Sequence, residues 1–287
     1  MRLLSPLILI ACALLNAEGA QLELVAGAQP ESVFSGAHRT VPLVFRNDGS
    51  RSFDHEIRAR VFQTETSVAL LLRQVSWKKL QVLPGQTVLE SAQLDFPVVA
   101  AETKFLIQWL DETNHVIGLT SILVYPTNLL QTLQPLLCET NFGVLDPGNQ
   151  LKPLLKAQGI SFVDLDEMGL ESFSGQLAVI GPFKSKAQMP DDLADEVKAL
   201  AQRNVAVVWI QPPQPLMPPP LDWERQKIQP SFYCVQKKQT PVIVVQPDVV
   251  SGLAENPQSQ IALIYFCHLA LRPQPAVLPD LSETFQP

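Results

Sequence analysis

Carboxylates follow two neighbouring apolar runs of this sequence, and they are the side chains best placed for chemistry. Asp146 follows the run 141–145, while Asp164, Asp166 and Glu167 end or follow the run 160–165. Carboxylates brought together in this way could bind a hard cation or act as general acid and base. Aspartate is also a frequent helix cap, and a helix can follow each run. Both interpretations, a reactive site and a set of caps, stay open at this point.

Other side chains could share a pocket with these carboxylates because they also follow apolar runs. If the runs are parallel strands, groups beyond their carboxyl ends converge on one crevice. The candidate ligand-binding residues are Asp146, Asp166, Gly181, Phe183, Gln211 and Trp223, with Phe183 and Trp223 as apolar walls.

A nucleophile with a base beside it is hard to find. Cys267 and His268 are adjacent in an expected helix, where neighbours point about 100° apart, so we interpret both as packing residues. No Gly-x-Ser-x-Gly, His-Glu-x-x-His, P-loop or Gly-x-Gly-x-x-Gly motif occurs. The sequence therefore predicts no catalytic residue, no metal and no cofactor, and it favours a protein that is not an enzyme.

The elements that position the candidate residues alternate between strand and helix over residues 140–272. Strands are expected at 141–145, 160–165, 177–180, 205–210 and 241–245, of which 177–180 and 205–210 are wholly apolar, and helices are expected at 151–158, 190–202 and 259–271. Alternation with continuous apolar strands predicts a doubly wound parallel sheet in a three-layer α/β/α domain.

In residues 20–125 the apolar residues recur with a different period, that of a β-strand. Seven or eight short strands alternate apolar and polar side chains, with turn clusters between them, which predicts a β-sandwich. The pattern resembles bacterial immunoglobulin-like modules, without a Cys-Trp-Cys signature. Trp77, Lys78 and Lys79 would be either a core tryptophan with solvated lysines or an exposed patch for a sugar or a partner. Residues 126–139 are expected to be a linker with helical character.

The order of elements after residue 140 resembles the class I glutamine-amidotransferase-like fold, a flavodoxin-like architecture. The resemblance rests on "FGVLDPGNQLKPLLKAQGISFVDLD", "LAVIGPF", "DDLADEVKALAQR" and "NVAVVWIQPP". Catalytic members carry a cysteine between glycines after the strand that corresponds to 205–210. Here the chain continues as Gln211-Pro212-Pro213, so the resemblance implies a domain without amidotransferase chemistry. Non-catalytic relatives of this kind occur in exported bacterial proteins beside β-sandwich modules.

The N-terminus predicts export. Arg2 precedes an apolar stretch, 3–15, that is shorter than the roughly 20 residues of a membrane span. We expect a signal peptide over 1–19 with cleavage after Gly19 or Ala20. Alternatively, Leu9-Ile10-Ala11-Cys12 resembles a lipobox, which would make Cys12 a lipidation site. Either route places the protein in the periplasm or at the cell surface, with no transmembrane span in the mature chain.

Three cysteines, Cys138, Cys234 and Cys267, remain after export, so at least one cannot pair within the chain. One disulfide and three buried thiols both stay open, and the second is favoured. Proline dominates two segments: 211–230, expected as a packed surface loop, and the tail 273–287, expected to be disordered.

Composition narrows the classes of function. Hydrophobic residues make up 46% of the 287, enough for a large core, and 21 basic against 28 acidic residues give a net charge of −7. A chain without a basic surplus is unsuited to nucleic acid. We therefore expect a non-enzymatic binding or scaffold protein of the bacterial envelope with a protein or carbohydrate partner. The alternative is a hydrolase that cleaves a glycan or an ester through Asp146 and Asp166.

Overall fold

The computed structural model describes residues 22–25, 27, 30–64, 68–137, 141–212, 225–228, 232–237 and 240–271, with the backbone alone for 225–228 and 232–237. These residues fall into two compact units: 1–31, 37–95 and 103–123 belong to the first, and 32–36, 96–102 and 124–287 to the second. The expected signal peptide with its cleavage site, Cys12, Cys138, Trp223 and the tail 273–287 lie outside the described residues.

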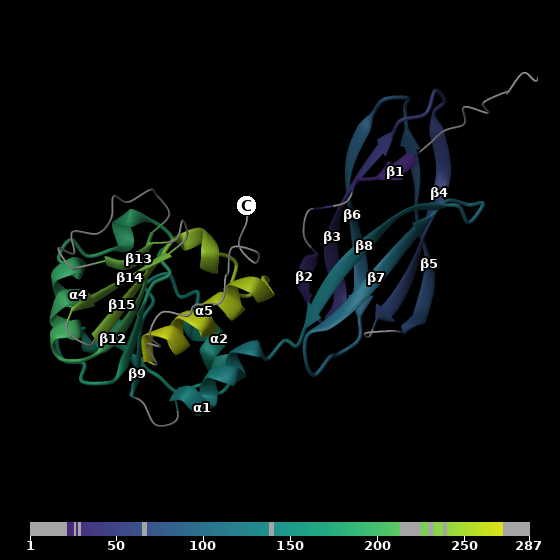
Figure 1. The fold of residues 1–287 in the computed structure, drawn as a ribbon. Coiled ribbons are helices and arrows are strands. Elements are labelled where there is room, and N and C mark those ends of the chain that lie inside the picture. The colour runs from purple at the N-terminus through teal and green to yellow at the C-terminus, as the bar shows by residue number, and fades with distance from the viewer. Residues whose placement is uncertain are drawn as a thin grey trace, which may run out of the picture. The chain divides into compact units, whose positions relative to one another are not determined.

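Residues 22–125 form two β-sheets (Figure 1). One has the strand order β1-β3-β6 and the other the order β2-β8-β7-β4-β5. The strands are β1 (Leu22–Leu24), β2 (Glu31–Phe34), β3 (Gly36–Asn47), β4 (Phe53–Thr64), β5 (Ala69–Val82), β6 (Thr87–Phe96), β7 (Thr103–Leu110) and β8 (Val116–Tyr125). Along β4, Phe53, Ile57, Ala59 and Val61 are buried, as their alternation in the sequence predicts.

Aromatic rings fill the core of these strands. The Trp77 ring lies 5.9 Å from the Phe45 ring and 5.2 Å from the Trp109 ring, measured between centroids. Lys78 and Lys79 instead form ion pairs with Glu90 and Asp54 near the surface. Trp77 is half-buried, with Lys78 Nζ 5.9 Å from its ring centroid, and its contacts with Phe45 and Trp109 favour the core interpretation over an exposed aromatic patch.

The second unit is built on a seven-stranded mixed sheet of order β10-β9-β11-β12-β15-β14-β13. The first five strands in this order are mutually parallel, and the last two pair antiparallel. The bounds are β9 (Phe142–Leu145), β10 (Val163–Asp164), β11 (Leu177–Ile180), β12 (Ala206–Ile210), β13 (Arg225–Ile228), β14 (Phe232–Lys237) and β15 (Thr240–Val245). Strands β9, β11, β12 and β15 are buried along their whole length, which explains their uninterrupted apolar sequences.

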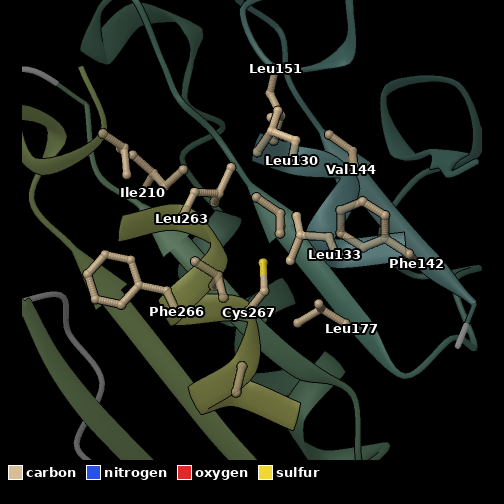
Figure 2. Close-up of a cluster of buried hydrophobic side chains, with 14 of the residues drawn as sticks. Leu130, Leu133, Phe142, Val144, Leu151, Leu177, Ile210, Leu263, Phe266 and Cys267 are labelled. Atoms are coloured by element: carbon tan, nitrogen blue, oxygen red, sulfur yellow. The ribbon is translucent and has the colours of Figure 1, made fainter. Parts of the chain in front are cut away.

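Two separate hydrophobic clusters cover the two faces of this sheet. One contains side chains of η1 (Leu129–Leu133), α1 (Gln134–Leu137), α2 (Lys152–Ala157) and α5 (Pro257–Leu271). Figure 2 shows this cluster, with the sulfur of Cys267 inside it. The other contains Leu193, Val197 and Leu200 of α4 (Leu193–Gln202), which corresponds to the helix that the sequence predicts at 190–202. Helices thus pack against both faces of the sheet.

Three segments differ from the sequence expectation, and one of them is β14, where no strand was expected. Leu130, Leu133, Leu136 and Leu137 of the expected linker are buried in the first of these clusters, so this stretch is part of the α/β unit. The proline-rich stretch expected to be an irregular loop contains β13, which extends the sheet at its edge. In the described part of the chain, no helix combines the length and hydrophobicity needed to cross a bilayer.

Candidate functional site

The order of the parallel strands brings the candidate residues to one edge of the sheet. Asp146, Gly181 and Gln211 directly follow β9, β11 and β12, which are neighbours in that order. We number the five parallel strands by their order in the chain. Across the sheet they then follow one another as second, first, third, fourth and fifth, so the direction of winding reverses between β9 and β11. Such a reversal is where open α/β sheets bind their ligands.

Both oxygens of the Asp146 carboxylate accept hydrogen bonds from backbone N–H groups. Oδ1 accepts a hydrogen bond from the N–H of Gln150 at 3.0 Å, and Oδ2 accepts from those of Leu151 and Lys152 at 2.7 and 2.9 Å. Lys152 is the first residue of α2 (Lys152–Ala157), Leu151 is its N-cap residue and Gln150 precedes it, and N–H groups at a helix start have no partner within the helix. Asp146 is 2% exposed, and burial raises the pKa of its carboxyl although the three backbone donors act against this. The residue is therefore a buried helix cap.

Lys152 joins the other two carboxylates. Its Nζ donates to Oδ1 of Asp164 and to Oδ2 of Asp166, and Oδ2 of Asp166 also accepts the N–H of Asp146 at 2.8 Å. Burial acts to lower the pKa of Lys152, but the two carboxylates raise it overall. Burial acts to raise the pKa of Asp164, but Lys152 and the N–H of Asp166 lower it overall. The structure thus brings Asp146 and Asp166 together through this lysine.

Sequence reasoning missed Lys152, yet the sequence contains a signal for it. The residue opens α2, where the partial positive charge of the helix dipole disfavours a cation. A lysine at that position needs carboxylates beside it, and the acidic residues after the second apolar run were available. Asp164 also caps α3 (Leu165–Met168) by accepting the N–H of Asp166 at 3.0 Å.

The turns after β9 and β11 are packed closely. A Cβ on Gly181, whose φ is +92°, would lie 2.7 Å from the carbonyl oxygen of Ile210. A Cβ on Gly148 would lie 3.2 Å from the carbonyl oxygen of Pro182. Phe183, expected to be a pocket wall, is 3% exposed within the cluster beneath α4. The turns after β9 and β11 therefore lie against each other and against the end of β12.

Gln211 is the one candidate whose polar atoms remain without a described partner. Its side chain is 1% exposed, and neither Oε1 nor Nε2 has a hydrogen bond among the described residues. The indole N–H of Trp209, two residues earlier in β12, is likewise buried and has no hydrogen bond among the described residues. Leaving a buried polar group unpaired costs about 1–3 kcal/mol.

The chemistry available at this edge is limited. The carboxylates are held by backbone N–H groups and one lysine, and no group of three or more His, Cys, Asp or Glu in the described residues could hold a metal ion. Cys267 is a buried free thiol whose pKa burial raises to about 12, and its neighbour His268 is exposed. The thiol and the imidazole therefore do not form a catalytic pair.

Two cavities lie away from this edge. One, of about 370 Å³, is lined by β1, β3 and β8, including Leu24, Pro42 and Leu119. The other, of about 440 Å³, is lined by Phe142 and by residues 159–163, which lie at the opposite ends of β9 and β10. Neither cavity is lined by a residue of the candidate set.

Comparisons with known proteins show weak likeness. No protein-family model matches the sequence, and no curated protein matches it. Among solved structures, an alkylpurine DNA glycosylase of Pseudomonas fluorescens matches at a TM-score of 0.29 and 7% identity, over 37% of this chain and 31% of that one. A Niemann-Pick type C2 protein of the Japanese carpenter ant matches at 0.27 and 10%, over 36% and 88%. The sporulation control protein Spo0M of Bacillus subtilis matches at 0.28 and 12%, over 41% and 56%.

Proposed function

We propose that this protein is an exported, non-enzymatic binding or scaffold protein of the bacterial envelope. It would consist of an immunoglobulin-like sandwich and a three-layer α/β/α domain of the amidotransferase-like type, with a protein or a carbohydrate as its partner. The flavodoxin-like order of the parallel strands and the helices on both faces of the sheet support this description of the second domain.

The proposal rests mainly on the hydrogen bonds and the burial of the Asp146 carboxylate. A general base needs a lone pair within reach of the proton it removes. Both oxygens of Asp146 face backbone N–H groups at the start of α2, and the residue is 2% exposed. Its carboxylate supports a structural task, the capping of that helix.

The end of β12 supports the same conclusion. In an amidotransferase-like domain this strand leads to the nucleophile, but here it leads to the buried amide of Gln211 and then to Pro212. Pro212 has no N–H to offer an oxyanion. The rival hydrolase draws on one observation, the contact of 2.8 Å between the N–H of Asp146 and Oδ2 of Asp166. It lacks an exposed carboxylate at Asp146.

The test uses the chain purified after export. It is immobilised and exposed to a detergent extract of its own envelope, and the captured proteins are quantified by mass spectrometry. In parallel, the free chain is applied to a glycan array and to chromogenic ester and glycoside substrates. Asp146→Asn serves as the matched variant, because it retains one oxygen for the cap and cannot act as a base.

A stoichiometric protein partner, or retention on one glycan class, is the expected result, and it should be unaffected by Asp146→Asn in the folded variant. Turnover of an ester or glycoside that Asp146→Asn abolishes, while folding is intact, would establish the hydrolase and overturn the proposal.

A further inference from the structure

The neighbouring strands β7, β4 and β5 carry a short apolar row on the outer face of their sheet (Figure 1). Phe62 of β4 lies opposite Leu71 of β5 on one side and opposite Leu106 of β7 on the other. Directly opposite residues of antiparallel strands project from the same face of a sheet. Val61, which precedes Phe62, is 1% exposed and faces the core, so these three side chains face outward. Leu71 is 49% exposed, and the other two are partly exposed.

A polar row lies beside the apolar one on the same face. Arg60 lies opposite Gln74 of β5 and opposite Gln108 of β7. Because residues two apart in a strand share a face at a spacing of about 7 Å, this row is adjacent to Phe62. The Arg60 side chain donates from Nε to Oε1 of Gln74 at 2.8 Å and from Nη2 to Oδ1 of Asn114 at 3.3 Å. A guanidinium has five N–H donors, so Arg60 keeps donors that no described residue accepts.

The charge beside the apolar row is positive. Lys104 of β7 lies opposite Thr64 of β4, so a second cation borders the row on the side away from Arg60. The ion pairs of the described residues include neither Arg60 nor Lys104. The next charges along β4, on Arg58 and Glu56, pair with each other at 3.7 Å. A chain of net charge −7 thus carries two unmatched cations on one face.

We propose that this face binds an anionic polysaccharide, a chain of sugars that carry carboxylates. Its side chains, which we name the Phe62 face, are Arg60, Phe62, Leu71, Lys104, Leu106 and Gln108. The inference deepens the proposed function and rests on it, because it takes a carbohydrate as the partner.

The chemistry of the Phe62 face selects this occupant. A sugar ring has an apolar side of C–H groups that can pack on the Phe62 ring, and its hydroxyls can pair with the amide of Gln108. A guanidinium binds a carboxylate through two parallel hydrogen bonds, which suits Arg60 to an acidic sugar. An acyl chain fits poorly, because the apolar row is one side chain wide and covering it would desolvate the cations at its borders.

Isothermal titration calorimetry of the chain purified after export tests the proposal, with an oligogalacturonate as the probe at low salt. The matched probe is the methyl ester of the same oligomer, which keeps the sugar rings and removes the charges. We expect the acid to bind and the ester to bind at least tenfold more weakly. Added salt should weaken the binding of the acid, because exposed charges are screened.

Arg60→Gln should weaken binding of the acid by about tenfold, the effect of losing a hydrogen bond between charged groups. Arg51→Gln is the matched control, because Arg51 is exposed and lies before β4, outside the Phe62 face. Phe62→Leu keeps an apolar side chain and removes the ring, and it should weaken binding of both probes. Thermal unfolding checks that each variant is folded, and Arg60→Gln remains decisive if Phe62→Leu unfolds.

Equal binding of acid and ester overturns the proposal, and so does an Arg60→Gln variant that binds like the parent chain. Equal competition by polyglutamate would show a surface that accepts any polyanion, which also overturns it. A folded chain that binds no oligogalacturonate but captures an envelope protein would overturn this inference and leave the proposed function intact. A chain that binds neither would remove both.

Discussion

Replacing Asp146 with alanine removes the acceptor of three backbone N–H groups at once. The hydrogen bonds of Leu151 and Lys152 are buried, and that of Gln150 is partly exposed. Loss of a helix cap costs about 0.5–2 kcal/mol, and a buried donor left unpaired costs about 1–3 kcal/mol. Relief from burying a carboxylate, the cause of its raised pKa, offsets part of this loss. We expect Asp146→Ala to lower the free energy of unfolding by about 2–3 kcal/mol.

Substitution with asparagine separates the effect of the hydrogen-bond acceptor at position 146 from the effect of its negative charge. Asp146→Asn retains one oxygen that can accept a hydrogen bond, so we expect a loss of about 1 kcal/mol. Urea unfolding followed by circular dichroism measures both variants, and an unchanged slope would show that only stability has changed. Because the pKa of Asp146 is raised in the folded state, the contribution of this carboxyl to stability is largest at pH values below the ordinary pKa of an aspartate. The contribution of this residue to stability should therefore fall as pH rises through the ordinary range of an aspartate.

One result would refute the reasoning. If Asp146→Ala unfolds at the same urea concentration as the parent chain, the carboxylate does not cap α2. The site would then need to be reconsidered as a reactive one.

Three further predictions concern the same edge of the sheet. Lys152→Met should lower stability by about 2 kcal/mol, less than a fully buried pair because its carboxylate partners are about a quarter exposed. The parent's loss of stability as pH falls through the lowered pKa of Asp164 should become shallower in this variant, as pH-dependent thermal unfolding can measure. Gln211→Leu should be neutral or should stabilise the chain by about 1 kcal/mol, since it removes unpaired buried atoms; a clear loss in urea unfolding would reveal a hidden partner. Gly181→Ala should cost at least about 2 kcal/mol more than Gly159→Ala, because both have positive φ but only Gly181 lies against a carbonyl oxygen; equal unfolding midpoints would contradict the crowding.

The sequence predicts β9, β11, β12 and β15 because strands buried on both faces are almost entirely apolar, whereas β14 was not predicted. The run 177–180 is entirely apolar, and all four residues are buried in β11. Asp146 and Asp166 were found because they follow such runs. Their roles could not be found in this way, because capping depends on backbone N–H groups four to six residues further along the chain.

Other features were missed for reasons that are also physical. Lys152 reaches Asp164 and Asp166 from a different element, a contact that no periodicity encodes. Strand β13 lies at the edge of the sheet, where neighbouring prolines are tolerated, so the proline-rich composition concealed it.

The sealed position of Cys267 makes it a natural reporter of motion. Thiols react as thiolates, and a thiol whose pKa is about 12 and which is fully covered by α5 and its neighbours is almost inert at neutral pH. A small alkylating reagent can reach it only when the packing around α5 opens. The rate of modification at the peptide that contains Cys267, followed by mass spectrometry, therefore measures how often the α/β unit opens locally. A ligand that binds the folded unit should slow the alkylation of Cys267 in proportion to the fraction of the protein that is bound.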